Sequence, residues 1–310
     1  MTIFGDEIYG YWYKGLAEGC RLCMEGLKVV IFVTGLCNYT CFYCPLSYDR
    51  RKADAFYVDE ERVDSLEIIL DEVTAVGAKG ASITGGEPLQ RIDLVLEIVR
   101  MLKSVFGSSF HIHLYTSGLY ASPNVFKELD RAGLDEIRFH PVDSSVWKVV
   151  EWVVKETSMC VGIEIPALPL EPLLKAVVLE AQKRGALFVN LNELEASETN
   201  IDALLARGYR VDLEGRRVPR SLEVAKRVVW WANHMGLEVS VHLCPSRFKE
   251  LVQMRYRLRR KGARCLSIGE ILEEDGAIRS GESLEIPLLS WCAPLLARAK
   301  RLAEGDRVGG

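Results

Sequence analysis

The sequence lacks any apolar run long enough to cross a membrane. Its longest run, about residues 29–33, falls far short of the ~20 apolar residues that a membrane-spanning helix needs. The first ten residues, MTIFGDEIYG, also lack the basic start and apolar core of a secretion signal. Together these absences predict a cytoplasmic protein with no membrane segment.

A large excess of charge of one sign is absent as well. The 310 residues include 39 basic and 43 acidic side chains, which gives a net charge of −4. The chain as a whole is therefore not suited to bind a polyanion, and any contact with nucleic acid must come from a local patch. Low-complexity tracts and long linkers are also missing, so the length and the 49% hydrophobic content favour one barrel-sized domain with additions.

One short stretch of the sequence has three cysteines and lacks a fourth. The stretch GLCNYTCFYCP holds Cys37, Cys41 and Cys44, and the chain has nine cysteines in all. An odd number in a chain expected in a reducing compartment favours thiols or metal ligands over disulfides. Three thiolates can hold three irons of a cubane cluster and leave the fourth iron open to a small molecule. A zinc site completed by a remote Cys or His is the alternative.

Short β-branched runs alternate with amphipathic helical patterns, which is typical of repeated βα units on a parallel sheet. Two wider intervals predict insertions, one with the cysteine loop and one with a helix and small hairpin near 195–215. The pattern predicts an α/β fold: a partial (β/α)6–7 TIM-like barrel over 28–245, an N-terminal extension (1–27) and a C-terminal appendage (246–310). A doubly wound sheet is the alternative. The expected strands are 29–35, 81–85, 111–116, 136–140, 161–166, 187–192 and 238–243.

Candidate site residues follow these strands. In either parallel fold, ligands bind at the carboxyl ends of the strands. The cysteine loop follows the first strand, Gly85-Gly86-Glu87-Pro88 follows the second, and Thr116-Ser117-Gly118 follows the third. We therefore expect one shared site, to which the ends of the next three strands add Arg138, Glu164, Asn190 and Asn192.

The pairing of C-x3-C-x-Y-C with a later GGEP resembles the radical S-adenosylmethionine (SAM) superfamily, and a weaker likeness extends over most of residues 28–245. Within it, TGLCNYTCFYCPLSYDR, TGGEPLQR, HIHLYTSG and NLNELEASETN resemble archaeal proteins described as related to pyruvate formate-lyase activating enzymes. The resemblance implies a [4Fe-4S] cluster that cleaves SAM reductively to methionine and a 5′-deoxyadenosyl radical. That radical would abstract a hydrogen atom from the substrate.

The resemblance also implies roles for the motif residues. Cys37, Cys41 and Cys44 would ligate the cluster, and Tyr43 would lie near the adenine. The GGEP turn would receive the methionine amino group, with Gly85 and Gly86 leaving backbone room, Glu87 offering an acceptor and Pro88 fixing the exit of the turn.

Four further residues would contact the rest of SAM. Ser117 stands where many relatives have Asn, next to the ribose. Arg138 could pair with the methionine carboxylate through a charged fork. Glu164 or Asn192 could bond to the ribose hydroxyls.

A second group of cysteines lies outside this motif. Cys20 and Cys23 form a C-x2-C pair before the first strand, whereas Cys244 ends the last strand and Cys265 and Cys292 follow it. An auxiliary cluster or zinc site formed by Cys20, Cys23 and Cys244 is one interpretation, and ordinary buried thiols are the other. Cys23 is within ~20 Å of the first strand. The pair can therefore meet Cys244 only if the N-terminal segment runs up the open side of the barrel.

Residues 246–264 carry eight basic side chains and one acidic side chain. In a helix, Phe248, Leu251, Val252 and Leu258 would form one side, and Arg257, Arg260, Lys261 and Arg264 the other. Such a basic face could meet phosphates, whereas a solvated helix face is the alternative.

The substrate stays open at this point. An RNA such as tRNA is motivated by the basic segment, and a partner protein's glycine by the likeness to glycyl-radical-enzyme activases. A peptide-modifying enzyme or one with a small-molecule substrate would use the same chemistry. An electron donor such as ferredoxin or flavodoxin is implied in each case. A non-catalytic zinc-binding protein is the alternative from a different class.

Overall fold

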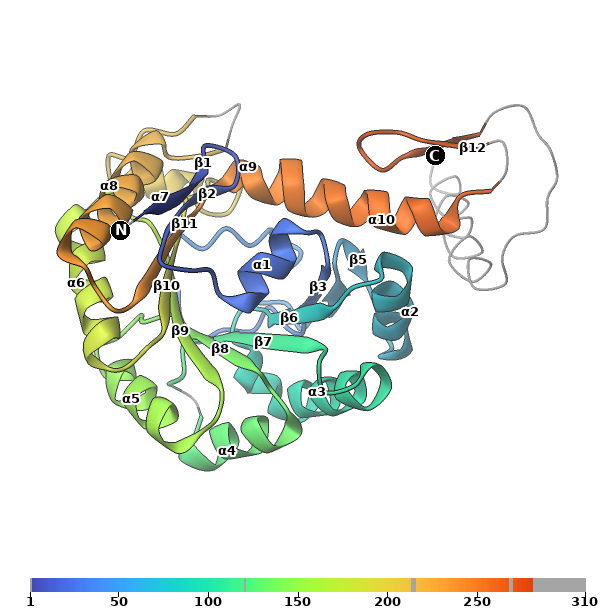
Figure 1. Ribbon diagram of the computed structural model, residues 1–310, viewed down its shortest axis with the longest axis horizontal. Coiled ribbons are helices and arrows are strands. Elements are labelled where there is room, and N and C mark those ends of the chain that lie inside the picture. Colours follow the sequence, from blue (N-terminus) through green and yellow to red (C-terminus); the bar gives the residue numbers. More distant parts are fainter. Residues whose placement is uncertain (1, 120, 213–215, 268–269, 281–310) are drawn as a thin grey trace.

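The computed structural model describes residues 2–119, 121–212, 216–267 and 270–280 (Figure 1). Cys292, the appendage after residue 280 and the turn of the expected small hairpin lie outside these residues. Eleven of the described strands form one sheet in the order β1-β2-β11-β10-β9-β8-β7-β6-β3-β4-β5. No helix in the described ranges is long and apolar enough to cross a membrane.

Seven consecutive strands of this sheet are parallel, and each overlaps a strand predicted from the sequence. Their order in the sheet follows their order in the chain, whereas a doubly wound sheet reverses its strand order partway. The partial barrel is therefore confirmed and the doubly wound alternative is wrong. The strands are β3 (Lys28–Phe32), β6 (Gly80–Thr84), β7 (His111–Thr116), β8 (Glu136–Phe139), β9 (Cys160–Pro166), β10 (Phe188–Asn192) and β11 (Ser240–Cys244).

Helices cover the convex face of the curved sheet (Figure 1). In α3, for example, the predicted apolar stripe is buried through Val95, Leu96, Val99 and Leu102. Burying such stripes against β-branched strand residues forms the main core. These helices are α2 (Glu67–Val76), α3 (Ile92–Phe106), α4 (Pro123–Ala132), α5 (Val146–Glu156), α6 (Glu171–Lys183) and α8 (Pro219–Met235). Two shorter elements, the 3-10 helix η1 (Pro88–Arg91) and α7 (Ile201–Leu205), follow β6 and β10.

Antiparallel strands extend both edges of the barrel. At one edge, β1 (Ile3–Asp6) and β2 (Gly10–Tyr13) form a hairpin, and β2 pairs with β11. At the other edge, β4 (Tyr57–Val58) and β5 (Glu61–Arg62) continue from β3. The N-terminal extension is therefore part of the main sheet.

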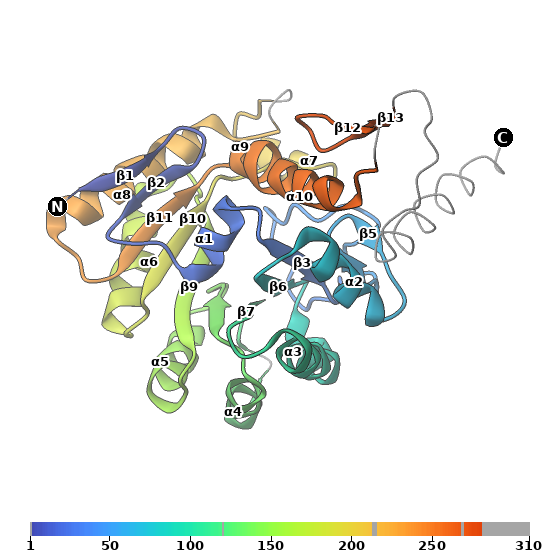
Figure 2. The same cartoon turned by 45° about the vertical axis from the view of Figure 1, so that its right-hand side comes forward.

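Helix α1 (Glu18–Met24) follows β2 and lies on the concave side of the sheet (Figures 1 and 2). It contacts β3, β6 and β7. A Cβ atom on Gly19 would lie 2.4 Å from His113 Nδ1 and 2.7 Å from Arg138 Nη2, so a larger residue would force these side chains apart. The N-terminal segment thus runs along the open side of the barrel and then enters its interior.

The basic segment forms a helical strap across the open side of the barrel (Figures 1 and 2). The strap consists of α9 (Ser246–Phe248), the π-helix η2 (Lys249–Met254) and α10 (Arg255–Cys265). It begins at the end of β11 and reaches α2 at the other edge. Of the predicted apolar side, Phe248 and Val252 are buried, whereas Leu251 and Leu258 are half-buried. A short hairpin of β12 (Glu270–Leu272) and β13 (Ile278–Ser280) follows.

Two basic side chains of the strap are bound to carboxylates at the far edge of the barrel. Arg257 is only 4% exposed, lies 3.1 Å from Asp59 through Nη1, and also pairs with Glu60. The Nζ atom of Lys261 lies 2.7 Å from Glu72. The prediction that Arg257 and Lys261 form a free phosphate-binding face is wrong, because these charges hold the strap to the barrel.

The other two residues of the expected basic face are exposed but also contact the barrel. Arg260 donates to the carbonyl of Glu25 at 3.0 Å, and Arg264 donates to the carbonyl of Thr74 at 3.4 Å. The RNA hypothesis therefore loses most of the surface that motivated it.

Candidate active site

A cavity of about 470 Å³ lies among the cysteine loop, the strand ends and α1. The structure brings the predicted cluster and SAM residues to this one cavity. Its lining includes Cys37, Cys41, Tyr43, Cys44, Gly85, Gly86, Glu87, Pro88, Ser117, Arg138, Glu164 and Asn192. It also includes the second group, Cys20, Cys23 and Cys244.

The cysteine loop and the GGEP turn are joined through their backbones. Gly86 N donates to Thr34 O at 2.7 Å, and Glu87 N donates to Leu36 O at 2.8 Å. A Cβ atom on Gly86 would lie 2.5 Å from Leu36 O and 2.9 Å from the Cβ of Cys37. Glycine is needed at Gly86 because the two segments approach too closely for any side chain.

The carboxylate of Glu87 fastens the second strand end to the third. It is 1% exposed and accepts hydrogen bonds from Thr116 Oγ1 at 2.6 Å, Ser117 N at 2.8 Å and Ser117 Oγ at 2.5 Å. A further bond comes from Leu89 N at 3.2 Å. Because these donors surround the carboxylate, the side chains of Glu87 and Ser117 position the turn.

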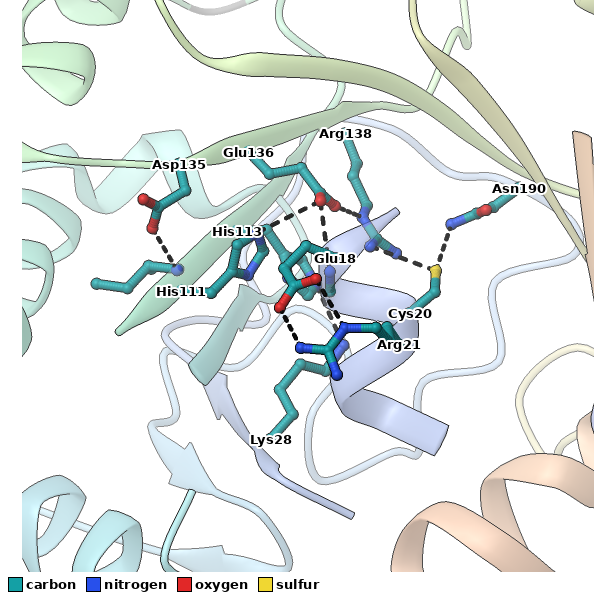
Figure 3. Close-up of polar contacts among 12 residues, drawn as sticks. Glu18, Cys20, Arg21, Lys28, His111, His113, Asp135, Glu136, Arg138 and Asn190 are labelled. Carbon is teal, nitrogen blue, oxygen red and sulfur yellow. Dashed lines mark hydrogen bonds and ion pairs between the residues drawn. The ribbon is translucent and has the colours of Figure 1, made fainter. Parts of the chain in front are cut away.

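The floor of the cavity is built around a buried arginine. Arg138 is 2% exposed, and its Nε lies 2.5 Å from Glu136 Oε1 while Nη1 lies 2.7 Å from Glu164 Oε2 and 3.2 Å from the Tyr115 hydroxyl. Burial alone would raise the pKa of Glu136, but Arg138 and His111 outweigh it and lower this pKa to about 2. Figure 3 shows Arg138 between Glu136 and α1. Arg138 is thus held as a structural cation.

Glu164 is an ionised acceptor at the edge of this floor. Besides Arg138, it accepts hydrogen bonds from Asn190 Nδ2 at 3.0 Å and Asn192 Nδ2 at 2.8 Å. Burial would raise the pKa of Glu164, but Arg138 and the two amides lower it below its ordinary value. The structure therefore presents a fixed negative charge to the cavity.

A histidine links the cysteine loop to the end of β8. His140 Nδ1 lies 2.9 Å from the carbonyl oxygen of Glu164, and His140 Nε2 lies 2.9 Å from the Tyr43 hydroxyl. Burial lowers the pKa of His140, which favours the neutral ring. Because a carbonyl can only accept, Nδ1 carries the proton and Nε2 accepts from Tyr43.

The segment between β10 and α8 clamps the cysteine loop, which the sequence did not predict. Asn200 is 1% exposed, and its Nδ2 donates to Tyr43 O at 3.1 Å and Glu195 O at 3.0 Å. Thr199 Oγ1 donates to Leu46 O at 2.6 Å. The signal was the polar run SETN, whose short side chains readily bond to backbone groups.

The three loop cysteines fit a cluster with one open iron. None of them is in a disulfide. Burial raises the pKa values of Cys37 and Cys41, and nearby Cys44 raises both further, so a bound cation would be needed to keep all three as thiolates. Among the described residues, no three His, Cys, Asp or Glu side chains are close enough to hold a single metal ion. The ligands of a cubane each bind a different iron and need not be so close.

Comparison with known proteins identifies the family. Residues 31–144 match the model of the Radical SAM superfamily. A protein of Methanocaldococcus jannaschii, provisionally named a glycyl-radical enzyme activating enzyme, is 34% identical over 280 residues, which cover 87% of this chain and 74% of that protein. The chain belongs to the radical SAM superfamily. It is therefore an enzyme that uses a [4Fe-4S] cluster and SAM, and family membership removes the zinc-protein alternative.

A further relative and a solved structure match only part of their length to this chain. A GTP 3′,8-cyclase of Lactiplantibacillus plantarum is 35% identical over 112 residues, which cover 35% of this chain and 31% of the cyclase. Streptococcus suis SuiB, bound to its precursor peptide SuiA, superimposes with a TM-score of 0.52 at 13% identity. That match covers 70% of this chain and 48% of SuiB, and it shows the shared fold alone.

Proposed function

We propose that this enzyme binds SAM at a cluster held by Cys37, Cys41 and Cys44 and abstracts a hydrogen atom from a substrate in the same cavity. The observation that carries the proposal is the single cavity lined by the three thiols, the GGEP turn and the strand-end side chains. When bound, the cluster supplies the electron that breaks the C5′–S bond of SAM, giving methionine and a 5′-deoxyadenosyl radical.

We assign SAM recognition to acceptor groups of residues that line the cavity. The methionine ammonium can only donate hydrogen bonds, so we assign the carbonyl oxygens of Gly85 and Gly86 as its acceptors. We assign the ionised Glu164 as an acceptor for the ribose hydroxyls. Arg138 directs its donors to protein partners, so we assign it the role of positioning Glu164 rather than that of binding the methionine carboxylate.

We further propose that the substrate is a polypeptide, with a glycine Cα–H of a partner protein as the hydrogen donor. The support is the likeness to the M. jannaschii protein over 87% of this chain, together with that protein's name. An RNA substrate stays a prediction, but Arg257 and Lys261 no longer support it.

Anaerobic turnover tests the reaction. The purified enzyme with dithionite and SAM is expected to release 5′-deoxyadenosine and methionine, whereas Cys41→Ala should release neither. Cys160→Ala is the matched control, because Cys160 is a thiol outside the cavity lining. Equal turnover by Cys41→Ala and the wild type would contradict the proposed cluster site.

Deuterium transfer tests the substrate class. Extract from cells grown in deuterated medium would be separated into protein, RNA and small-molecule fractions, and each incubated with the enzyme and unlabelled SAM. We expect deuterium in 5′-deoxyadenosine, measured by mass spectrometry, only with the protein fraction. Label from the RNA or small-molecule fraction alone would overturn the polypeptide proposal while leaving the proposed radical chemistry intact.

A further inference from the structure

The second group of cysteines meets on one side of the cavity. Cys20 and Cys23 are three residues apart on α1, which places them on the same face of the helix, and Cys244 is the last residue of β11. All three line the cavity. They meet because β2 pairs alongside β11 and α1 then turns into the barrel interior (Figure 2).

The sulfur of Cys20 is surrounded by hydrogen-bond donors. Asn190 Nδ2 lies 3.2 Å away and Arg138 Nη2 lies 3.5 Å away, and both groups point at the sulfur in Figure 3. An ordinary buried cysteine behaves as a small apolar side chain and packs among apolar neighbours. Cys20 instead faces N–H donors, and hydrogen bonds of this kind tune the ligand sulfurs of iron–sulfur clusters.

These cysteines form a group distinct from the loop cysteines. The loop of Cys37 follows β3 and is joined to the GGEP turn through the bond from Glu87 N to Leu36 O. Cys20 instead lies on α1, where its sulfur contacts Arg138 and Asn190. One cavity is thus lined by two separate sets of three cysteines.

A buried imidazole adjoins the second group. His242 is 3% exposed and lines the cavity. Its Nδ1 lies 3.3 Å from Asn190 Oδ1. Its Nε2 is buried without a hydrogen-bond partner in the described structure. Such a group is costly to leave unpaired, so a ligand in the cavity would relieve it.

We propose that Cys20, Cys23 and Cys244 bind a second [4Fe-4S] cluster in the wall of the cavity. The site goes beyond the proposed function, which requires only the first cluster. A single zinc ion fits less well, since no three ligand side chains in the described part of the chain converge on one point. Facing the cavity, the cluster would lie beside the bound substrate.

Iron counting after anaerobic reconstitution tests the proposal. The wild type should bind about eight irons per chain, because each cubane holds about four. Cys23→Ala/Cys244→Ala should bind about four and still cleave SAM. A variant with Cys37, Cys41 and Cys44 all changed to Ala should also bind about four but cleave no SAM. Cys160→Ala should match the wild type.

The outcomes separate this inference from the proposed function. A wild-type enzyme with about four irons that still cleaves SAM would overturn the second cluster and leave the proposed function standing. Stoichiometric zinc that disappears in Cys23→Ala/Cys244→Ala would replace the cluster with a zinc site. Eight irons without SAM cleavage would instead contradict the proposed function alone. The iron count of the wild type tests the proposed second cluster even if a variant fails to fold.

Discussion

The two groups of three cysteines share one cavity but are built in different ways. Cys37, Cys41 and Cys44 lie on one loop, whose spacing alone indicates a cluster. Cys20 and Cys23 come from a short helix and Cys244 from the other end of the barrel. The first group depends on local sequence. The second depends on tertiary contacts, namely the pairing of β2 with β11 and the strap that closes the open side.

The largest effect should come from disturbing the first group alone. Gly86→Ala places a methyl group 2.5 Å from Leu36 O, so the GGEP turn must move away from the cysteine loop. A displacement of about 1 Å at a reacting centre can lower rates roughly 100-fold, and we expect at least that loss in 5′-deoxyadenosine formation. Gly15→Ala is the control, because a Cβ there meets nothing within 4 Å. Full activity in Gly86→Ala would show that the close contact is dispensable.

The ion pairs of the strap at the far edge of the barrel should contribute to the stability of the fold. Arg257→Ala leaves Asp59 buried without its cation, which should cost up to about 3–5 kcal/mol of unfolding free energy at a pH above 7, where Asp59 is ionised. Urea unfolding would measure this loss. The exposed Arg259→Ala should change stability by less than about 0.5 kcal/mol. Equal effects of the two substitutions would mean that the strap is a solvated helix.

The hydrogen bonds of Asn200 to the cysteine loop should affect iron binding by the first group more than iron binding by the second. Asn200→Ala leaves the carbonyls of Tyr43 and Glu195 without their donor, which costs roughly 1–3 kcal/mol for each buried group left unpaired. We expect less iron at the cysteine loop and slower SAM cleavage. Added to the Cys23→Ala/Cys244→Ala background, which retains only the first cluster, the substitution should lower the iron count further. The exposed Asn124→Ala should leave the count unchanged.

The last prediction concerns the pH dependence of stability. Burial raises the pKa of Asp59 to about 7, against a value near ~3.9 in the unfolded chain. The folded state therefore binds this proton more tightly, so stability should fall as pH rises from about 4 to about 7. Asp59→Asn should flatten this slope in unfolding measurements, whereas the exposed Asp71→Asn should not. An unchanged slope in Asp59→Asn would refute the raised pKa.

Much of the fold followed from local patterns. The seven parallel strands were predictable because β-branched runs alternate with amphipathic helices, and the loop cysteines because their spacing is local. The contact of Asn200 with the cysteine loop was not predictable, since Asn200 bonds to the carbonyl of Tyr43, which is 157 positions away. The basic face of the strap was predicted wrongly for a similar reason. Arg257 and Lys261 look solvated in the sequence, and only the folded barrel brings Asp59 against Arg257 and Glu72 against Lys261.

The central claim is that SAM binds at the cluster held by the loop cysteines. The most direct measurement is the electron paramagnetic resonance spectrum of the dithionite-reduced enzyme with and without SAM. The account predicts that SAM changes one [4Fe-4S] signal, and that this signal is lost in Cys41→Ala while a SAM-insensitive signal from the second group persists. A spectrum that SAM does not change, or a SAM-sensitive signal that survives in Cys41→Ala, would contradict it.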